Sequence, residues 1–237
     1  MLFRRSLGGL GPKKTATSAL ANGLVSWWPM QEASGFTRED FVGTNDLGNS
    51  FGAITQVTGH VEAFASGFDG GEHHGLFCDD NPTLAFHQPW SLLCWIKLGA
   101  YPPTTMGWFG KQFTEFRAHA LGNNIAPGVV QCSFAGQDVY WGTIPDPTQW
   151  AMTVTFYDPA GDCGGSLNGG VRSVQAVNPA TGIIPDGSNT FWIGQNQTSG
   201  GPATAHMGPC GLWNRILTDS ETAHLWNGGA GRALGAI

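Results

Sequence analysis

The chain has 237 residues, of which 41% are hydrophobic and 12% are charged. It is therefore long and apolar enough to bury a large core, which excludes a disordered protein. The formal net charge of -6 makes a nucleic-acid-binding protein unexpected, and no run approaches the roughly 18 apolar residues of a membrane-spanning helix. The 36 glycines and 14 prolines, without a collagen-like repeat, favour many short strands joined by tight turns.

Residues 1–22 form a basic arm ahead of an acidic body. Four of the eleven basic residues lie in this arm: Arg4, Arg5, Lys13 and Lys14. Residues 15–237 contain the remaining 7 basic residues and all 17 acidic ones. Such an arm contacts a negatively charged partner, either nucleic acid or the acidic surface of another subunit, or else it stays a solvated tail.

The same segment lacks the apolar stretch of a secretory signal peptide, so we expect no signal peptide. The cysteines are odd in number and widely spaced, without a C-x-x-C motif: Cys78, Cys94, Cys132, Cys163 and Cys210. This pattern predicts neither a zinc site nor a disulfide framework, and it favours free thiols in a reducing compartment.

From residue 23 onward, short apolar runs alternate with turn signals, which predicts one β-rich domain over residues 23–237. In the first run, Trp27 and Trp28 point to opposite faces of a strand, so at least one must face the core. The run SLLCWIKL at 91–98 is apolar on both faces apart from Lys97, as expected for a strand covered on both sides. The run QWAMTVTFYD at 149–158 alternates between an apolar and a mixed face.

Two local signals near the C-terminal half are stronger than the rest. Asn168 followed by Gly169 is typical of a tight hairpin turn. Thr218 and Glu221 have the spacing of a capping box, and Asn227 with the glycines after it is a helix stop, so we predict one short helix between them.

The order of these motifs resembles the laminin-G-like domains of the concanavalin A-like superfamily. The resemblance covers roughly residues 23–231 and is carried by GLVSWWPMQEASG, FVGTNDLGN, WSLLCWIKL, TQWAMTVTFYDPAG and CGLWNRILTDSETAHLWNGG. It implies an all-β fold, a concanavalin A-like jelly-roll sandwich of two antiparallel sheets with one short C-terminal helix. Because this fold carries lectins, glycosidases, adhesion modules and structural proteins, the resemblance does not by itself assign a function.

Catalytic signals are weak, so we expect no enzyme activity. The one pair of acidic residues spaced for neighbouring positions on a strand, Asp219 and Glu221, belongs to the predicted helix start. The superfamily's Glu-x-Asp-x-x-Glu pattern is absent. The stretch GNSFG at 48–52 fits a nucleophile motif formally, but a β-branched, turn-like segment follows it instead of a helix.

No cofactor or metal site is assigned. Glu72, His73 and His74 fit a polar turn better than a metal site, since adjacent strand residues diverge. Calcium is bound by many relatives, and three residues could be ligands: Asp46, Asp69 and Asp186. However, Gly208 and Pro209 stand where those relatives carry an acidic pair, so the resemblance does not support a calcium site.

We predict a non-enzymatic structural or interaction protein, a virion component such as a capsid decoration or tail-associated protein. Its arm would dock on a neighbouring acidic subunit through the four basic residues named above, in a homo-oligomer for which a trimer is plausible. Stand-alone domains of this type resemble those among phage structural proteins. The alternative is a carbohydrate-binding module that recognises surface glycans through exposed aromatic and amide side chains, for which the candidates are Trp108, Trp141 and Asn196.

Overall fold

A computed structural model describes residues 19–35, 37–49, 54–71, 74–102, 106–111, 116–120, 127–134, 137–176, 188–194 and 204–237. The basic residues of the arm and Asn196 lie outside these ranges. The described strands are β1 (Leu24–Trp28), β2 (Gly48–Asn49), β3 (Thr55–Thr58), β4 (Phe64–Asp69), β5 (Leu76–Cys78), β6 (Trp90–Lys97), β7 (Met106–Lys111), β8 (Phe116–Ala120), β9 (Val129–Phe134), β10 (Gln137–Thr143), β11 (Ala151–Asp158), β12 (Asp162–Leu167), β13 (Ser173–Ala176), β14 (Phe191–Ile193) and β15 (Thr204–Trp213).

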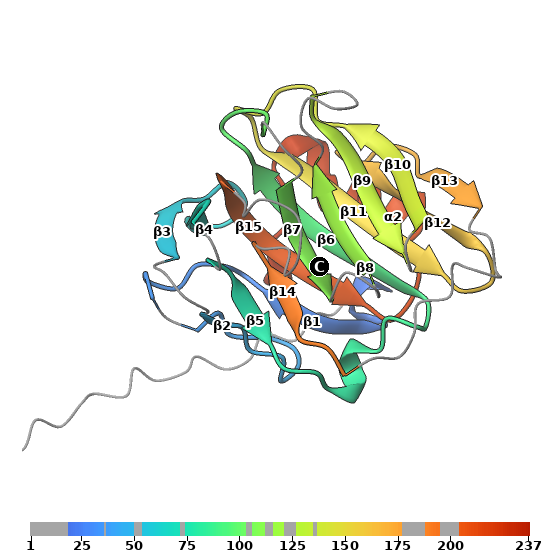
Figure 1. The fold of residues 1–237 in the computed structure, drawn as a ribbon, viewed down its shortest axis with the longest axis horizontal. Helices are drawn as coiled ribbons and strands as arrows, with labels where there is room; N and C mark the ends of the chain where they lie inside the picture. Colours follow the sequence, from blue (N-terminus) through green and yellow to red (C-terminus); the bar gives the residue numbers. More distant parts are fainter. Residues whose placement is uncertain are drawn as a thin grey trace, which may run out of the picture.

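These strands form two antiparallel sheets packed face to face (Figure 1). The eight-stranded sheet has the order β13-β12-β11-β6-β15-β4-β3, and β1 pairs with the later half of β15. The seven-stranded sheet has the order β10-β9-β8-β7-β14-β5-β2. The predicted all-β jelly-roll sandwich with one short helix, α2 (Asp219–Trp226), is therefore confirmed.

The central strand β6 is covered on both faces, as its composition predicts. Leu92, Cys94 and Ile96 belong to the core between the sheets. Leu93 and Trp95 point the other way, into a second apolar cluster beneath α2 and the C-terminal tail. The eight-stranded sheet thus has an inner face toward its partner sheet and an outer face that is partly covered by the end of the chain.

The adjacent tryptophans divide between these two clusters. Trp28 lies in the inner core, where its ring stacks on Phe191 with centroids 5.7 Å apart. Trp27 lies in the outer cluster and meets the edge of Trp213, with centroids 6.3 Å apart. Both rings are buried, because each face of β1 is covered. Gly211 is required beneath them, since a Cβ there would come within 2.8 Å of both Trp27 and Trp213.

The two strong local signals are confirmed. Asn168 and Gly169 both have positive φ, 54° and 68°, at the turn that follows β12. Thr218 caps α2, and its capping box with Glu221 is complete. Asn227 ends the helix in the left-handed conformation with φ 51°.

The first described residues pack on the sandwich. The single turn η1 (Ala19–Ala21) places Leu20 in the outer cluster. Residues 19–22, which the sequence pattern assigns to the arm, therefore belong to the packed part of the molecule.

Candidate functional site

An open groove lies on the outer face of the eight-stranded sheet, away from α2. Its volume is about 580 Å³, large enough for a small ligand. Its walls come from β3 and the start of β4 on one side and from β6, β15 and the residue before β11 on the other. The lining residues are Gln56, Val57, Thr58, Gly59, Phe64, Lys97, Trp150 and His206.

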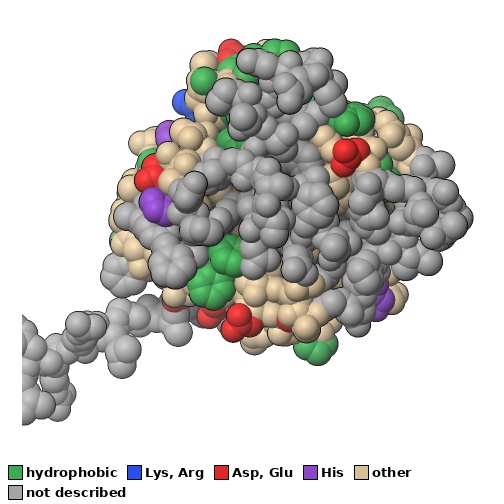
Figure 2. Space-filling model, viewed as in Figure 1, with side chains coloured by type: hydrophobic (Ala, Val, Ile, Leu, Met, Phe, Trp, Pro, Cys, Tyr) green, Lys and Arg blue, Asp and Glu red, His purple; other side chains and the backbone are tan. Residues whose placement is uncertain are grey.

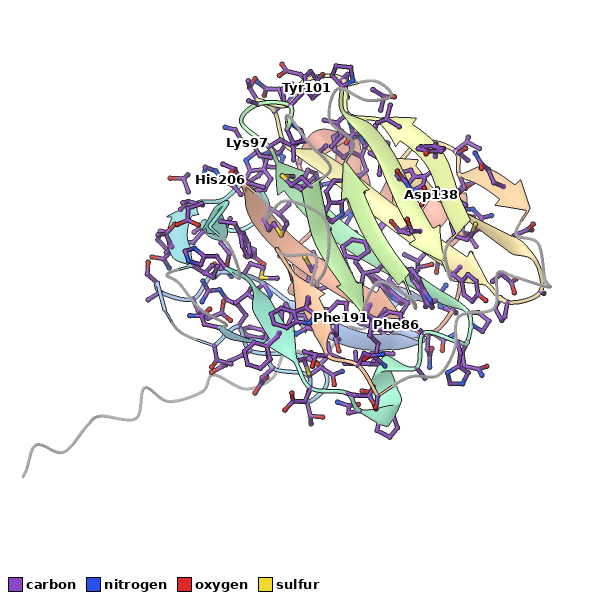
Figure 3. All side chains as sticks on the ribbon, in the orientation of Figure 1. Phe86, Lys97, Tyr101, Asp138, Phe191 and His206 are labelled. Atoms are coloured by element: carbon purple, nitrogen blue, oxygen red, sulfur yellow. The ribbon has the colours of Figure 1, made fainter. Side chains whose placement is uncertain are left out.

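Strand pairing brings the three most distinctive lining residues together. Lys97 and His206 are direct partners across β6 and β15. Ala151 pairs with Ile96, so Trp150 stands next to Lys97 on the other side of β6. Paired side chains on one face of an antiparallel sheet have Cβ atoms about 5 Å apart. Figure 3 shows Lys97 and His206 side by side at one end of their strands.

Lys97 differs from the other basic side chains that the structure describes. Each of the others has a partner: Arg38 bonds Ser66, Lys111 bonds Asp80, Arg172 bonds Asp219, Arg215 bonds Glu221 and Arg232 bonds Asn227. Within the described part of the chain, Lys97 has no hydrogen-bond or ion-pair partner, although it is half-buried. Its positive charge is therefore available to a ligand in the groove.

His206 is half-buried beside this charge. Burial lowers the pKa of His206 below its ordinary value, and the positive charge of Lys97 lowers it further. The neighbouring carboxylate along the same face of β4 belongs to Asp69, which is held by the backbone N–H of Gly71 and by His74 at 2.7 Å. The neutral imidazole of His206 is consequently favoured, and in that form it can accept or donate a hydrogen bond.

A row of rings connects the groove with the covered end of the same face. Trp226 of α2 stacks on Trp95 with centroids 5.3 Å apart, and His60 lies 5.0 Å from Trp95. His60 also stacks on Trp150 at 6.0 Å, and Trp150 lies 6.4 Å from His206. The row fixes the indole of Trp150, which is half-buried, at the wall of the open groove.

The outward face of the seven-stranded sheet carries a polar chain of contacts on β9 and β10. The amide of Gln131 donates to the hydroxyl of Ser133 at 3.3 Å, and that hydroxyl donates to Asp138 at 2.5 Å. Tyr140, the strand partner of Gln131, is 37% exposed. Figure 2 views this side of the molecule, where acidic side chains show at several separate places and basic ones at the edge.

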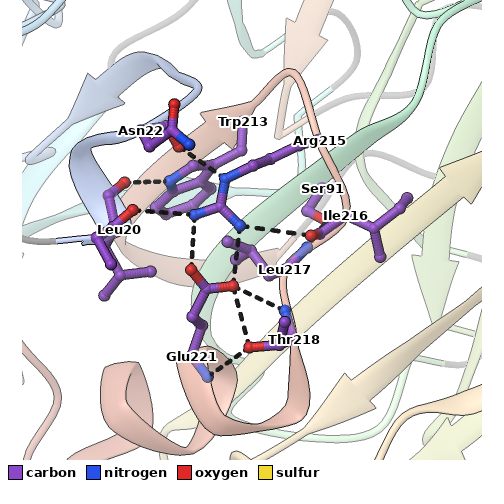
Figure 4. A network of polar contacts seen from close by, with 10 residues as sticks. Leu20, Asn22, Ser91, Trp213, Arg215, Ile216, Leu217, Thr218 and Glu221 are labelled. Atoms are coloured by element: carbon purple, nitrogen blue, oxygen red, sulfur yellow. Dashed lines mark hydrogen bonds and ion pairs between the residues drawn. The ribbon is translucent and has the colours of Figure 1, made fainter.

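A third feature fastens the first described residues to the body (Figure 4). Arg215 forms a two-point ion pair with Glu221, with N–O distances of 2.9 and 2.7 Å. The same guanidinium donates to the carbonyls of Asn22 at 2.7 Å and Ala19 at 3.2 Å. The indole N–H of Trp213 donates to the carbonyl of Leu20 at 2.7 Å. We call Trp213, Arg215 and Glu221 the arm clamp.

The expectation that Trp108 and Trp141 are exposed is wrong. Trp108 is fully buried, and Trp141 is 6% exposed because it belongs to the core between the sheets. The indole N–H of Trp141 points inward and donates to the sulfur of Cys132 at 3.0 Å. Neither ring offers a face to a ligand.

The sequence does contain the signal that locates the groove. Lys97 is the exception to the apolar pattern of its strand, and Trp150 stands at the beginning of the next one. The sequence pattern does not show that β11 and β15 lie on either side of β6. This strand order places Trp150 and His206 next to Lys97.

The metal candidates are not assembled among the residues the structure describes. The carboxylate of Asp46 accepts a hydrogen bond from the backbone N–H of Asp40 at 2.7 Å. The carboxylate of Asp69, at the end of β4, instead contacts the ring of His74. No group of three or more His, Cys, Asp or Glu side chains with metal-binding geometry occurs in the described part of the chain. Glu72, His73 and Asp186 lie outside it. All five cysteines are free and buried.

The described ranges contain no helix with the length and apolar character needed to cross a membrane. No known protein-family profile matches the sequence, and no curated protein matches it.

Solved structures with the same fold are numerous, and they share little sequence with this chain. The binding domain of Paraclostridial Mosquitocidal Protein 1 has a TM-score of 0.67 and 13% identity, over 87% of this chain and 52% of that one. Botulinum neurotoxin type C, in a structure titled for its interaction with two ganglioside molecules, has a TM-score of 0.65 and 11% identity, over 87% and 51%. Trypanosoma rangeli sialidase with the inhibitor DANA has a TM-score of 0.64 and 16% identity, over 91% and 34%.

These similarities define the class of fold, an antiparallel jelly-roll β-sandwich. The chain spans about half of the two toxin structures and about a third of the sialidase. At such identities the likeness establishes the fold alone.

Proposed function

We propose that this protein is a carbohydrate-binding domain and that sugars bind in the groove around Trp150. The observation that carries the proposal is the groove itself, with a half-buried indole beside Lys97 and His206 and polar side chains at Gln56 and Thr58. A pyranose ring has apolar C–H faces and polar edges. An aromatic wall with hydrogen-bonding groups around it matches both.

The structural neighbours support a binding role without assigning a ligand. One is titled as a binding domain, another for an interaction with gangliosides, and a third holds a sialidase inhibitor. A related neurotoxin binding domain is in complex with the protein rat synaptotagmin II, at a TM-score of 0.66 and 11% identity. Each title describes a whole chain, of which the matched sandwich is about half in the toxins and about a third in the sialidase.

The experiment compares Trp150→Ala with a matched control on the other sheet, Tyr140→Ala. Binding to an immobilised panel of neutral and acidic oligosaccharides would be measured, with thermal unfolding to confirm that both variants fold. We expect Trp150→Ala to lose at least about tenfold in affinity, since stacked aromatic contacts dominate such sites. Loss in Tyr140→Ala with Trp150→Ala unchanged would move the site to the seven-stranded sheet.

The proposed role is non-enzymatic. Glycoside hydrolysis commonly needs two carboxyl groups on either side of the scissile bond, about 5–10 Å apart. Among the residues that the structure describes, no carboxylate lines the groove. Incubation of a bound oligosaccharide with the protein should therefore release no reducing ends, and their release would contradict the proposal.

A second candidate function is favoured by the arm clamp. Arg215 and Trp213 donate hydrogen bonds to the carbonyls of Ala19, Leu20 and Asn22. These bonds attach the beginning of the described chain to the sandwich. This suits a component of a larger assembly, such as a virion, that is attached through Arg4, Arg5, Lys13 and Lys14 to acidic neighbouring subunits.

Co-sedimentation tests the second candidate. The full chain would be compared with a deletion of residues 1–18, which leaves the clamped residues in place, and with a variant whose four arm cations are replaced by serine. We expect the full chain to travel with a large particle from its source and both variants to stay in the supernatant. If all three remain in the supernatant, the arm does not anchor the protein.

A further inference from the structure

We propose that the groove selects acidic sugars, in which a carboxylate or sulfate group sits between Lys97 and His206 while the sugar ring stacks on Trp150. This inference rests on the proposed carbohydrate-binding function and names the chemical class of the ligand. It comes from the distribution of charge around the groove.

The first argument is that Lys97 has no counter-charge within the part of the chain that the structure describes. The chain contains 17 acidic and 11 basic residues, yet none of the described residues that line the groove is acidic. The described Lys and Arg side chains elsewhere are held by carboxylates, hydroxyls, amides or carbonyls. Lys97 is half-buried as a residue and makes no described hydrogen bond or ion pair, so an incoming anion gains a charge-assisted hydrogen bond without displacing an internal partner.

The second argument is geometric. Lys97 and His206 are cross-strand partners on one face of the sheet, and Trp150 is the neighbour of Lys97 on the opposite side. An anionic group can therefore accept from the ammonium group and from the imidazole at once. The ring that carries the anion then lies over the strands toward Trp150 or toward Phe64, which is 44% exposed.

The third argument concerns His206. Its pKa is lowered by burial and by the positive charge of Lys97. A bound anion opposes the effect of Lys97, so binding must raise the pKa of His206. A neutral sugar would not have this effect, which gives the proposal a spectroscopic readout.

The experiment uses two matched pairs of probes on the full chain. Tetragalacturonic acid is compared with its methyl ester, and a sulfated galactan tetrasaccharide with its desulfated form. Titration calorimetry gives the affinities, and NMR of the histidine ring gives the pKa of His206. The variants are Lys97→Gln, the charge-preserving Lys97→Arg, and Arg232→Gln as a charge-matched control outside the groove.

We expect at least one acidic probe to bind about tenfold more tightly than its neutral counterpart, the gain typical of a hydrogen bond to a charged group. Lys97→Gln should abolish that preference, whereas Lys97→Arg and Arg232→Gln should keep it. Whichever pair shows the preference identifies carboxylate or sulfate as the anion.

Equal affinity of the wild-type protein for both members of each pair, with binding still dependent on Trp150, would overturn the inference and leave the proposed function intact. Absence of binding to every saccharide would instead remove the proposed function, and the inference with it. A preference for acidic probes that survives in Lys97→Gln would also overturn the inference, because the anion would then bind elsewhere.

Discussion

Each end of the outer face of the eight-stranded sheet contains a tryptophan and a basic residue. At one end the tryptophan is buried and the basic residue is paired, and at the other the tryptophan is partly exposed and the basic residue has no described partner. At the covered end, Trp213 is buried and Arg215 is paired with Glu221 and with the carbonyls of Ala19 and Asn22. At the open end, Trp150 is half-buried, and Lys97 has no partner among the described residues. A row of rings from Trp226 to His206 joins them.

The difference shows what distinguishes structural use from ligand binding in this fold. A tryptophan and a cation contribute to stability where the chain itself supplies the carboxylate, the carbonyls and the covering helix. Where the helix does not cover the sheet, a tryptophan and a cation form a site instead. A ligand can then supply the anionic group and the covering surface that the chain does not provide there. Substitutions at the two ends should therefore separate stability from binding.

The largest contrast is expected between Trp213→Ala and Trp150→Ala. Removal of Trp213 leaves a cavity under the outer cluster and should lower the free energy of unfolding by about 3–5 kcal/mol. Removal of Trp150 should cost about 1 kcal/mol, because its ring is partly in water already. Urea denaturation measures both, and similar losses would show that Trp150 is a core residue.

Charge removal gives the next contrast. Arg215→Gln removes the ion-pair partner of Glu221, which keeps only its hydrogen bonds to Thr218, and should cost about 2–4 kcal/mol. Lys97→Gln should change stability by no more than about 0.5 kcal/mol, since no described interaction is lost. A large loss in Lys97→Gln would reveal a structural role and weaken the case for a ligand.

The arm clamp also has a pH signature. The ion pair with Arg215 lowers the pKa of Glu221 to about 2, despite an opposing effect of burial. A carboxyl whose folded pKa is below its unfolded value stabilises the fold above the unfolded value, about 4.3, and this contribution disappears as the pH falls toward 2. We expect Glu221→Gln to reduce the steepness of acid unfolding, monitored by tryptophan fluorescence. Identical acid-unfolding curves of the wild-type protein and Glu221→Gln would show that the ion pair contributes nothing to stability.

The smallest effect is expected at the open end. Burial, and then the positive charge of Lys97, lowers the pKa of His206 below its ordinary value, so the imidazole gains its proton only on acidification. Its protonation adds a second positive charge to the groove, so affinity for a sulfated sugar should rise about threefold from pH 7.5 to pH 5. Sulfate stays ionised over this range, and the neighbouring Asp69 is already held by His74. In His206→Gln, the affinity for the sulfated sugar should not change with pH. A wild-type affinity that is also independent of pH would exclude a role for this imidazole.

Part of the fold follows directly from local pattern. The two-sided apolar run ending at Lys97 becomes the central strand β6, and Asn168 with Gly169 makes the turn that follows β12. The capping box of Thr218 and Glu221 starts α2 where the spacing predicts it. Each of these depends on contacts within a few residues, or on a periodicity that one strand displays alone.

The site was less predictable for a physical reason. Alternation assigns side chains to two faces of a strand, but it does not say which face another layer covers. Trp108 and Trp141 therefore appear equivalent to Trp150 in the sequence, although the first two are buried and the third borders the groove. Leu20 lies in a segment that composition assigns to the arm, and only its contacts with the outer cluster place it in the domain.

The sequence by itself determined the class of fold, the position of the helix and its caps, and the burial of at least one of Trp27 and Trp28, because local propensity and periodicity carry that information. Among the described basic side chains, the tertiary structure alone decided that Arg215 is paired and that Lys97 is not. Arg215 meets Glu221 and the carbonyls of residues 19 and 22 because β1 and β15 pair and the chain turns into α2 beside them. Lys97 lies at the other end of the same sheet, beyond that cover, where long-range strand pairing supplies Trp150 and His206 and no described carboxylate lines the groove.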